Sequence, residues 1–184
     1  MRHKPRILSI RTLARTRIFH VEELELEFSN GARARYERIH GGAGGSVLVV
    51  PMPDPETVLL IREYAAGTDR YELGFPKGRI EPDEGPLEAA QREIREEIGC
   101  AARELIELGE LTIAPGYIRA RTHVVLARGL REAPLAGDEP EPVEVVPWPL
   151  DDVRGLLRRD DVSEARTLAA WLMTRTHLQG GPDD

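Results

Sequence analysis

The sequence contains a single cysteine, Cys100, in 184 residues. One cysteine cannot form a disulfide within the chain, so the composition gives no sign of an oxidising compartment. Long apolar runs are also missing, since none approaches the roughly 20 residues that a membrane-spanning helix needs. Arg11, Arg15 and Arg17 interrupt the segment after the basic N-terminus, unlike the apolar core of a secretory signal. These absences predict a cytoplasmic protein without membrane association.

Basic side chains are in deficit, with 25 Lys and Arg against 32 Asp and Glu and a formal net charge of −7. A broad nucleic-acid-binding surface needs a concentration of basic residues, so nucleic acid is not an expected partner. An acidic protein that handles phosphates usually places a divalent cation between its carboxylates and the phosphate. The length and the ordinary hydrophobic content favour one domain with its own core.

The apolar patterns alternate between strands and helices. Residues 19–39 predict a β-hairpin that turns at Asn30-Gly31, and a glycine-rich joint follows at residues 41–45. Further strands are expected at residues 47–50, 58–61, 105–111, 123–127 and 143–148, and helices at 86–98, 150–159 and 163–178. This order predicts an α/β fold with a mixed β-sheet between helices.

Three segments are expected along the chain. Residues 1–45 form the N-terminal β-hairpin segment, 46–178 the main domain, and 179–184 a disordered tail. The hairpin alternates apolar and acidic residues, so it has one wet face and belongs at the periphery or in a subunit contact. The pattern therefore favours a homodimer that is formed through this segment.

The helix expected at residues 86–98 carries the most informative chemistry. Pro86 suits its first turn and Gly99 its end. One apolar stripe is expected to face the sheet, and it consists of Leu87, Ala90, Ile94 and Ile98. Three carboxylates lie along one flank of this stripe: Glu93, Glu96 and Glu97. Such carboxylates repel one another unless a cation such as Mg²⁺ or Mn²⁺ binds. Considered alone, the helix could equally present a solvated acidic face.

The loop before the helix separates these two interpretations. Gly78, then Glu84, then the run from Arg92 to Gly99 match the signature of the Nudix hydrolase superfamily in spacing and residue type. Cys100 is the one departure, because the family has an aliphatic residue there; a small, weakly polar cysteine should pack in the same way. The chain thus resembles Nudix hydrolases, and the resemblance implies an α/β/α sandwich with a mixed β-sheet.

The resemblance also implies a reaction and roles for residues. Nudix enzymes use Mg²⁺, with Mn²⁺ as an alternative and two or three ions per site, to hydrolyse a pyrophosphate linkage. Glu93 and Glu97 would be the main metal ligands, Glu96 a further ligand or orienting base, and the carbonyl of Lys77 a backbone ligand. Four motif residues would be structural, with an ion pair joining loop to helix: Gly78, Glu84, Arg92 and Gly99.

Other segments resemble the ADP-ribose pyrophosphatase branch of that superfamily. They are residues 61–64, residues 71–78 and Pro115, which lies fifteen residues after Cys100, although Pro115 could also mark a simple turn. In that branch the residues matching Arg62 and Glu72 help to hold the nucleotide, and we add Lys77 and Arg79 as phosphate-binding candidates. Lys77 could instead be an ordinary surface lysine.

A late glutamate in the related pyrophosphatases acts as a base or an extra metal ligand. Glu139 and Glu141 lie in the acidic proline-rich loop at residues 137–142 and match this position, with Glu139 as the candidate catalytic residue and a merely solvated loop as the alternative. Across its length the chain most resembles the bacterial ADP compounds hydrolases of this branch, in which dimers are common. That resemblance implies hydrolysis of ADP-ribose, NADH and diadenosine oligophosphates to AMP and a phosphorylated product.

Two other functions stay open. One is a Nudix enzyme that cleaves nucleoside triphosphates or nucleic-acid caps, for which residues 61–78 and Pro115 would have little meaning. The other is a Nudix-fold sensor that binds a nucleotide without hydrolysing it. Sensors usually lose motif carboxylates, whereas this chain keeps all of them.

Overall fold

A computed structural model of the chain describes residues 3–41, 44–137 and 140–180. The chain forms two compact units, Met1–Gly45 with Thr112–Arg121, and Ser46–Leu111 with Thr122–Asp184. We describe each unit by itself. In the described parts of the chain, no helix is both long and apolar enough to cross a membrane.

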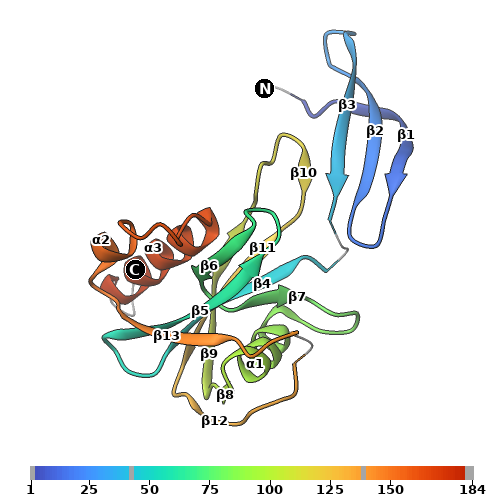
Figure 1. Ribbon diagram of the computed structural model, residues 1–184. Coiled ribbons are helices and arrows are strands. Elements are labelled where there is room, and N and C mark those ends of the chain that lie inside the picture. Colours follow the sequence, from blue (N-terminus) through green and yellow to red (C-terminus); the bar gives the residue numbers. More distant parts are fainter. Residues whose placement is uncertain (1–2, 42–43, 138–139, 181–184) are drawn as a thin grey trace. The chain divides into compact units, whose positions relative to one another are not determined.

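The first unit is a four-stranded sheet (Figure 1). Strands β1 (Arg6–Arg15), β2 (His20–Glu27) and β3 (Arg33–His40) run antiparallel in chain order, and the short β10 (Ile118–Arg119) pairs with β3 in parallel. The predicted hairpin corresponds to β2 and β3, and its turn contains Gly31 with a φ of +81°. The sequence patterns do not predict β1, because arginines interrupt it. In the structure Arg6 and Arg11 form cross-strand ion pairs with Glu27 and Glu23 of β2.

The second unit is built on a mixed sheet in the order β7-β4-β11-β9. Its central strands, β4 (Ser46–Met52) and β11 (Thr122–Arg128), are parallel, and both are buried on their two faces. Antiparallel edges are added by β7 (Lys77–Arg79) and β9 (Glu104–Leu111). Two further short strands, β8 (Cys100–Ala101) and β12 (Arg131–Glu132), form a separate antiparallel pair.

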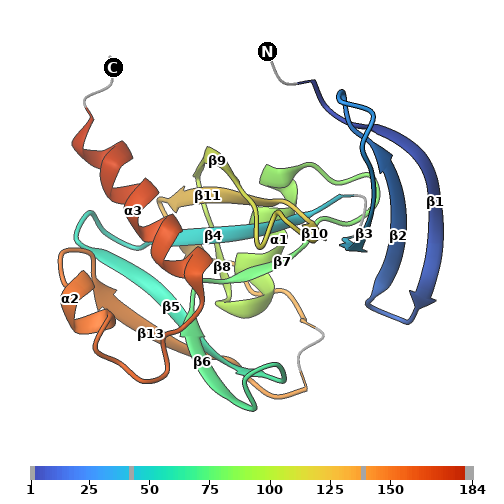
Figure 2. The same ribbon diagram turned by 90° about the horizontal axis from the view of Figure 1, so that it is seen from above.

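Alternate residues of β4 and β11 face two separate hydrophobic cores. On one face, Val47 and Val49 pack with Ile94 of α1 (Pro86–Glu97). On the other face, Leu48 and Val50 pack with Trp171 of α3 (Ala165–Gln179) and with a second antiparallel sheet. That sheet has the strand order β13 (Glu144–Pro149), β5 (Thr57–Ala65) and β6 (Arg70–Gly74). Helices α1 and α3 therefore cover opposite faces of the mixed sheet (Figures 1 and 2), which confirms the α/β/α architecture.

Two local predictions are wrong. The helix expected over residues 150–159 is only the four-residue α2 (Val153–Leu156), capped at its start by the Asp152 side chain. Gly155 lies in its middle and weakens helix formation. Leu87 does not belong to the buried stripe of α1 but is 40% exposed, and Ala89 is buried instead. The buried face is thus rotated toward the carboxylate flank, which brings Glu93 and Glu97 inside.

Candidate active site

Helix α1 is fixed at both ends by local interactions. Gly85 is its N-cap, Pro86 begins it, and the Glu88 carboxylate accepts a hydrogen bond of 2.6 Å from the Gly85 N–H. At the other end Gly99 adopts a φ of +69°, a conformation that costs a glycine little. The helix therefore starts and stops where the sequence predicts, and its carboxylates have fixed positions along it.

Two of these carboxylates converge on the segment Lys77–Gly78 at the start of β7. Glu93 and Glu97 are only 7% and 8% exposed. An oxygen of Glu97 accepts a hydrogen bond of 3.1 Å from the backbone N–H of Lys77. The Glu93 carboxylate lies so close to Gly78 that a Cβ there would overlap its Oε1. Only glycine leaves room for the carboxylate at this point.

Both buried carboxylates are costly to ionise. Burial raises the pKa of Glu93, and burial together with the neighbouring negative charge of Glu93 raises the pKa of Glu97 to about 8. A bound cation would reverse this effect, since it favours the ionised form of both groups. Two neighbouring carboxylates are hard oxygen donors, so the residues present fit a divalent ion such as Mg²⁺.

Arg92 organises the rest of the motif. Its guanidinium makes two hydrogen bonds to Glu84, of 2.8 and 3.0 Å, and one of 2.8 Å to the carbonyl of Arg79. This pairing lowers the pKa of Glu84. Arg92 Nη1 also donates to Glu93 Oε1 and to Glu96 Oε2, at 2.8 and 2.9 Å. Arg92 thereby joins loop to helix and turns Glu96 toward itself.

Glu96 shares the Arg92 Nη1 donor with Glu93, so its carboxylate lies near that of Glu93 but is held by the guanidinium. Among residues 3–41, 44–137 and 140–180, no group of three or more His, Cys, Asp or Glu side chains is arranged to hold a metal ion. The metal site suggested by the geometry is thus the Glu93–Glu97 pair next to the backbone of β7. Ligands other than acidic, His or Cys side chains of the described residues would have to complete the coordination of the ion.

The other candidate residues lie in two further groups. Lys77 places its ammonium 2.9 Å from Glu63 Oε2, close to the carboxylate pair. Arg62 pairs instead with Glu144 and Asp161, at 2.9 and 3.2 Å. Among the described residues, Arg62 therefore makes no direct contact with Glu93 or Glu97.

Glu72 and Arg79 serve local contacts. Glu72 accepts hydrogen bonds from the Ser163 hydroxyl and N–H, at 2.8 and 3.2 Å, and so ties β6 to the segment before α3. The backbone carbonyl of Arg79 accepts a hydrogen bond from Arg92, and Arg79 itself is exposed. Glu139 lies outside the described residues.

Glu63 is a neighbour of the site that the sequence patterns did not single out. It follows Arg62 directly in β5, but its pairing with Lys77 depends on how β5 and β7 come together in the fold. It also lines a cavity of about 320 Å³, together with Arg62, Tyr64, Tyr71 and Glu141. The hydroxyl of Tyr71 donates a 2.5 Å hydrogen bond to Glu141, and both residues line this cavity.

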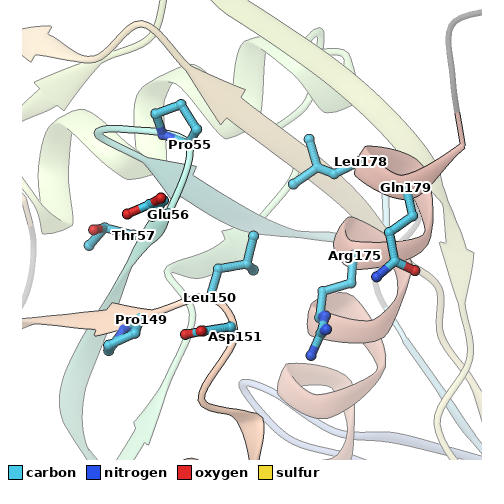
Figure 3. Close-up of a pocket in the computed structure, with 9 residues that line it drawn as sticks. All are labelled: Pro55, Glu56, Thr57, Pro149, Leu150, Asp151, Arg175, Leu178 and Gln179. Atoms are coloured by element: carbon cyan, nitrogen blue, oxygen red, sulfur yellow. The ribbon is translucent and has the colours of Figure 1, made fainter.

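A larger cavity, of about 510 Å³, lies elsewhere in the same unit (Figure 3). Thr57 and Pro149, at the ends of β5 and β13, face Arg175 and Leu178 of α3 across it. No residue of the motif lines it. Cavity size is therefore a poor guide here, and the convergent carboxylates define the candidate site.

Comparison with known families decides the assignment. A model of the NUDIX domain matches residues 43–172, and a model of the NudE-type Nudix hydrolase N-terminal domain matches residues 5–38. The chain belongs to the Nudix hydrolase family. This membership makes it a Nudix pyrophosphohydrolase, an enzyme class that generally depends on divalent metal ions, and it confirms the interpretation of the sequence motif.

Relatives of this Nudix hydrolase match over nearly its whole length. ADP compounds hydrolase NudE of Escherichia coli is 46% identical over 177 residues, which are 96% of this chain and 95% of that protein. ADP-ribose pyrophosphatase of Bacillus subtilis is 31% identical, over 94% of this chain and 97% of that protein. A crystal structure of an ADP compounds hydrolase superposes with a TM-score of 0.91 at 45% identity, covering 98% and 97% of the two chains.

The close approach of Gly78 and Glu93 gives a first testable prediction. In Gly78→Ala the new Cβ overlaps the Glu93 carboxylate and must displace it. Because a displacement of about 1 Å at a reacting site can cost about 100-fold in rate, we expect kcat to fall by that order. Steady-state kinetics with Mg²⁺ titration would measure it. Gly67→Ala is the matched control, since nothing lies within 4 Å of a Cβ there; equal kinetics for both variants would contradict the prediction.

Proposed function

We propose that this Nudix hydrolase cleaves the pyrophosphate bond of ADP compounds, releasing AMP and a phosphorylated second product. The substrates expected are ADP-ribose, NADH and diadenosine oligophosphates. Support comes from two relatives, similar over at least 94% of this chain, whose names specify ADP compounds and ADP-ribose. The N-terminal match to the NudE-type model supports the same branch of the family.

The observation that carries the proposal is the buried carboxylate pair against Lys77–Gly78. We assign Glu93, Glu97 and the Lys77 carbonyl as ligands of Mg²⁺, with Mn²⁺ as a substitute and two or three ions per site. When bound, such ions neutralise the pyrophosphate oxygens and make a water molecule a stronger nucleophile. Glu96, held by Arg92, orients the site, and Glu139 is the proposed base, a role that rests on the family resemblance.

The remaining residues of the chain bind and position the substrate in this proposal. Arg92 keeps the loop of Glu84 and the carbonyl of Arg79 fixed on α1. Lys77 and Arg79 supply positive charge for the phosphates. Arg62 and Glu72 hold the nucleotide, although in the structure each is engaged in contacts within the protein, so substrate binding must exchange or extend those contacts.

The N-terminal segment is assigned to dimerisation. Its strand β1 is an edge strand of the four-stranded sheet and exposes Ile7, Ile10 and Leu13 at 39% or more. We expect residues 1–45 to form a subunit contact and contribute to the partner's pocket, with 46–178 as the catalytic domain. Light scattering should give twice the chain mass of 20.6 kDa; a monomer at assay concentration would rule the dimer out. The cytoplasmic location stays a prediction.

A substrate panel tests the proposed reaction. Purified protein in Mg²⁺ is incubated with ADP-ribose, NADH, diadenosine oligophosphates and nucleoside triphosphates, and the products are separated by chromatography. We expect AMP from the ADP compounds and little product from the triphosphates. Pyrophosphate from triphosphates alone would favour the triphosphate-cleaving alternative, and binding without any turnover would favour a sensor.

The raised pKa of Glu97 predicts how metal affects stability. In metal-free protein the folded-state pKa of about 8 exceeds the usual value of 4.5, so the folded state binds this proton more tightly. Its contribution is complete below pH 4.5 and is lost as pH rises through 8, at a full cost of roughly 5 kcal/mol. Thermal unfolding in EDTA should therefore give a lower Tm at pH 8.5 than at pH 6. Mg²⁺ should raise Tm more at pH 8.5; an equal effect at both pH values would argue against metal binding at Glu97.

A further inference from the structure

Lys77 carries a charge that lies between two carboxylates. Its ammonium is 2.9 Å from Glu63 Oε2, while its backbone N–H donates to Glu97 at 3.1 Å. The ammonium is also near enough to Glu97 to favour the ionised form of that buried group. A flexible side chain with three donors can reach different partners from one backbone position. The side chain of Lys77 is thus paired with Glu63, and the buried Glu97 is a second carboxylate near its charge.

Glu63 holds the lysine from the opposite sheet. Lys77 opens β7 of the mixed sheet, and Glu63 lies in β5 of the second sheet, so their ion pair joins the two. The side chain of Glu63 is 34% exposed and borders the 320 Å³ cavity, whereas Glu97 is almost completely buried. An ammonium held by Glu63 leaves the Glu97 carboxylate to other ligands.

The residue type at position 77 fits this arrangement. Lys4 and Lys77 are the only lysines in a sequence with 25 basic residues of the Lys and Arg type. Arg92, another cation of the motif, makes a bidentate pair of hydrogen bonds with Glu84. Lysine is a compact charge on a flexible stem and does not form such a rigid fork. Position 77 thus has the basic residue that is easier to move from one partner to another.

We propose that Glu63 is a positioning residue for the metal site, which holds the Lys77 ammonium away from Glu97 so that a divalent cation can bind at Glu93 and Glu97. The inference rests on the proposed function, because it takes those two carboxylates as metal ligands. Without Glu63, the ammonium pairs with Glu97 and competes with the metal ion. Removing the lysine as well removes the competitor, so the effect of losing Glu63 should then largely disappear.

Binding of Mn²⁺ alone, followed by the electron paramagnetic resonance signal of the free ion, tests this without substrate or turnover. The proteins are wild type, Glu63→Gln, Lys77→Met and the double variant, with unfolding curves to establish that each is folded. We expect Glu63→Gln to weaken Mn²⁺ binding about tenfold, since the metal must displace a charged hydrogen bond. Lys77→Met should bind Mn²⁺ at least as tightly as wild type. In the Lys77→Met background, Glu63→Gln should change the affinity by less than about twofold.

The alternatives give different patterns. A tenfold loss in both backgrounds would make Glu63 a direct ligand or a simple contributor of negative charge, and no loss in either would make the ion pair purely structural; both results overturn the proposal. Glu23→Gln, which breaks the 3.1 Å ion pair with Arg11, is the matched control and should bind as wild type. Glu97→Gln tests the underlying site: unchanged Mn²⁺ binding there would refute the metal assignment itself, independently of Glu63.

Discussion

Replacement of Glu97 by glutamine is expected to lower kcat by about 1,000-fold, since a lost metal contact can remove several kcal/mol of transition-state stabilisation. Glutamine keeps the shape of the side chain and can still accept the hydrogen bond from the N–H of Lys77. It cannot supply the negative charge that a divalent cation needs. The protein should therefore fold normally and lose its reaction.

Stability separates this outcome from misfolding. The buried Glu97 carboxylate is costly to ionise, as its pKa of about 8 indicates. Metal-free Glu97→Gln should thus be at least as stable as wild type at pH 8.5, and Mg²⁺ should raise its Tm less. Glu37→Gln, the same change at an exposed surface glutamate, should leave kinetics and stability unaltered. A near-normal rate for Glu97→Gln would remove Glu97 from the metal site.

Replacement of Arg92 by alanine is expected to damage both activity and stability. Arg92 binds Glu84, Glu93 and Glu96 and the carbonyl of Arg79. Its loss leaves the nearly buried Glu93 without a counter-charge, and we expect the free energy of unfolding to fall by about 2 to 4 kcal/mol. The loop from Arg79 to Glu84 also loses its tie to α1, so kcat should drop by about 100-fold.

Urea unfolding and steady-state kinetics measure the two effects of Arg92→Ala. Arg95→Ala is the matched control on the same helix, because among the described residues the Arg95 side chain makes one hydrogen bond, of 3.1 Å, to the carbonyl of Ala133. Arg92→Lys should recover little, since lysine cannot make the two-pronged contact with Glu84. If Arg92→Ala behaved like Arg95→Ala, the network around Arg92 would have no role in organising the site.

The parts of the fold that were predictable are those with a local signal. Helix α1 is bracketed by Pro86 and Gly99, and the spacing of its glutamates follows directly from helical geometry. The buried strands β4 and β11 are continuous apolar runs, and they are typical of central strands in a mixed sheet. For the same reason the motif from Gly78 to Gly99 was enough to identify the family.

The rest depends on contacts between distant segments. β10 has two residues and is a strand only because Ile118 and Arg119 pair with β3. The rotation of α1 that buries Glu93 is decided by packing against the sheet, and the helical stripe alone favoured Leu87. The pairing of Glu63 with Lys77 joins strands of different sheets. Such contacts leave no periodic trace in the sequence.

The most direct test of the central claim follows AMP release from ADP-ribose by phosphorus NMR, first in EDTA-treated protein and then as Mg²⁺ is added back. The same titration is run with Glu97→Gln. We predict no AMP without divalent metal, a rise of the rate to saturation for the wild type, and almost none for the variant. AMP release in EDTA, or full activity of Glu97→Gln, would contradict a metal-dependent pyrophosphohydrolase centred on Glu93 and Glu97.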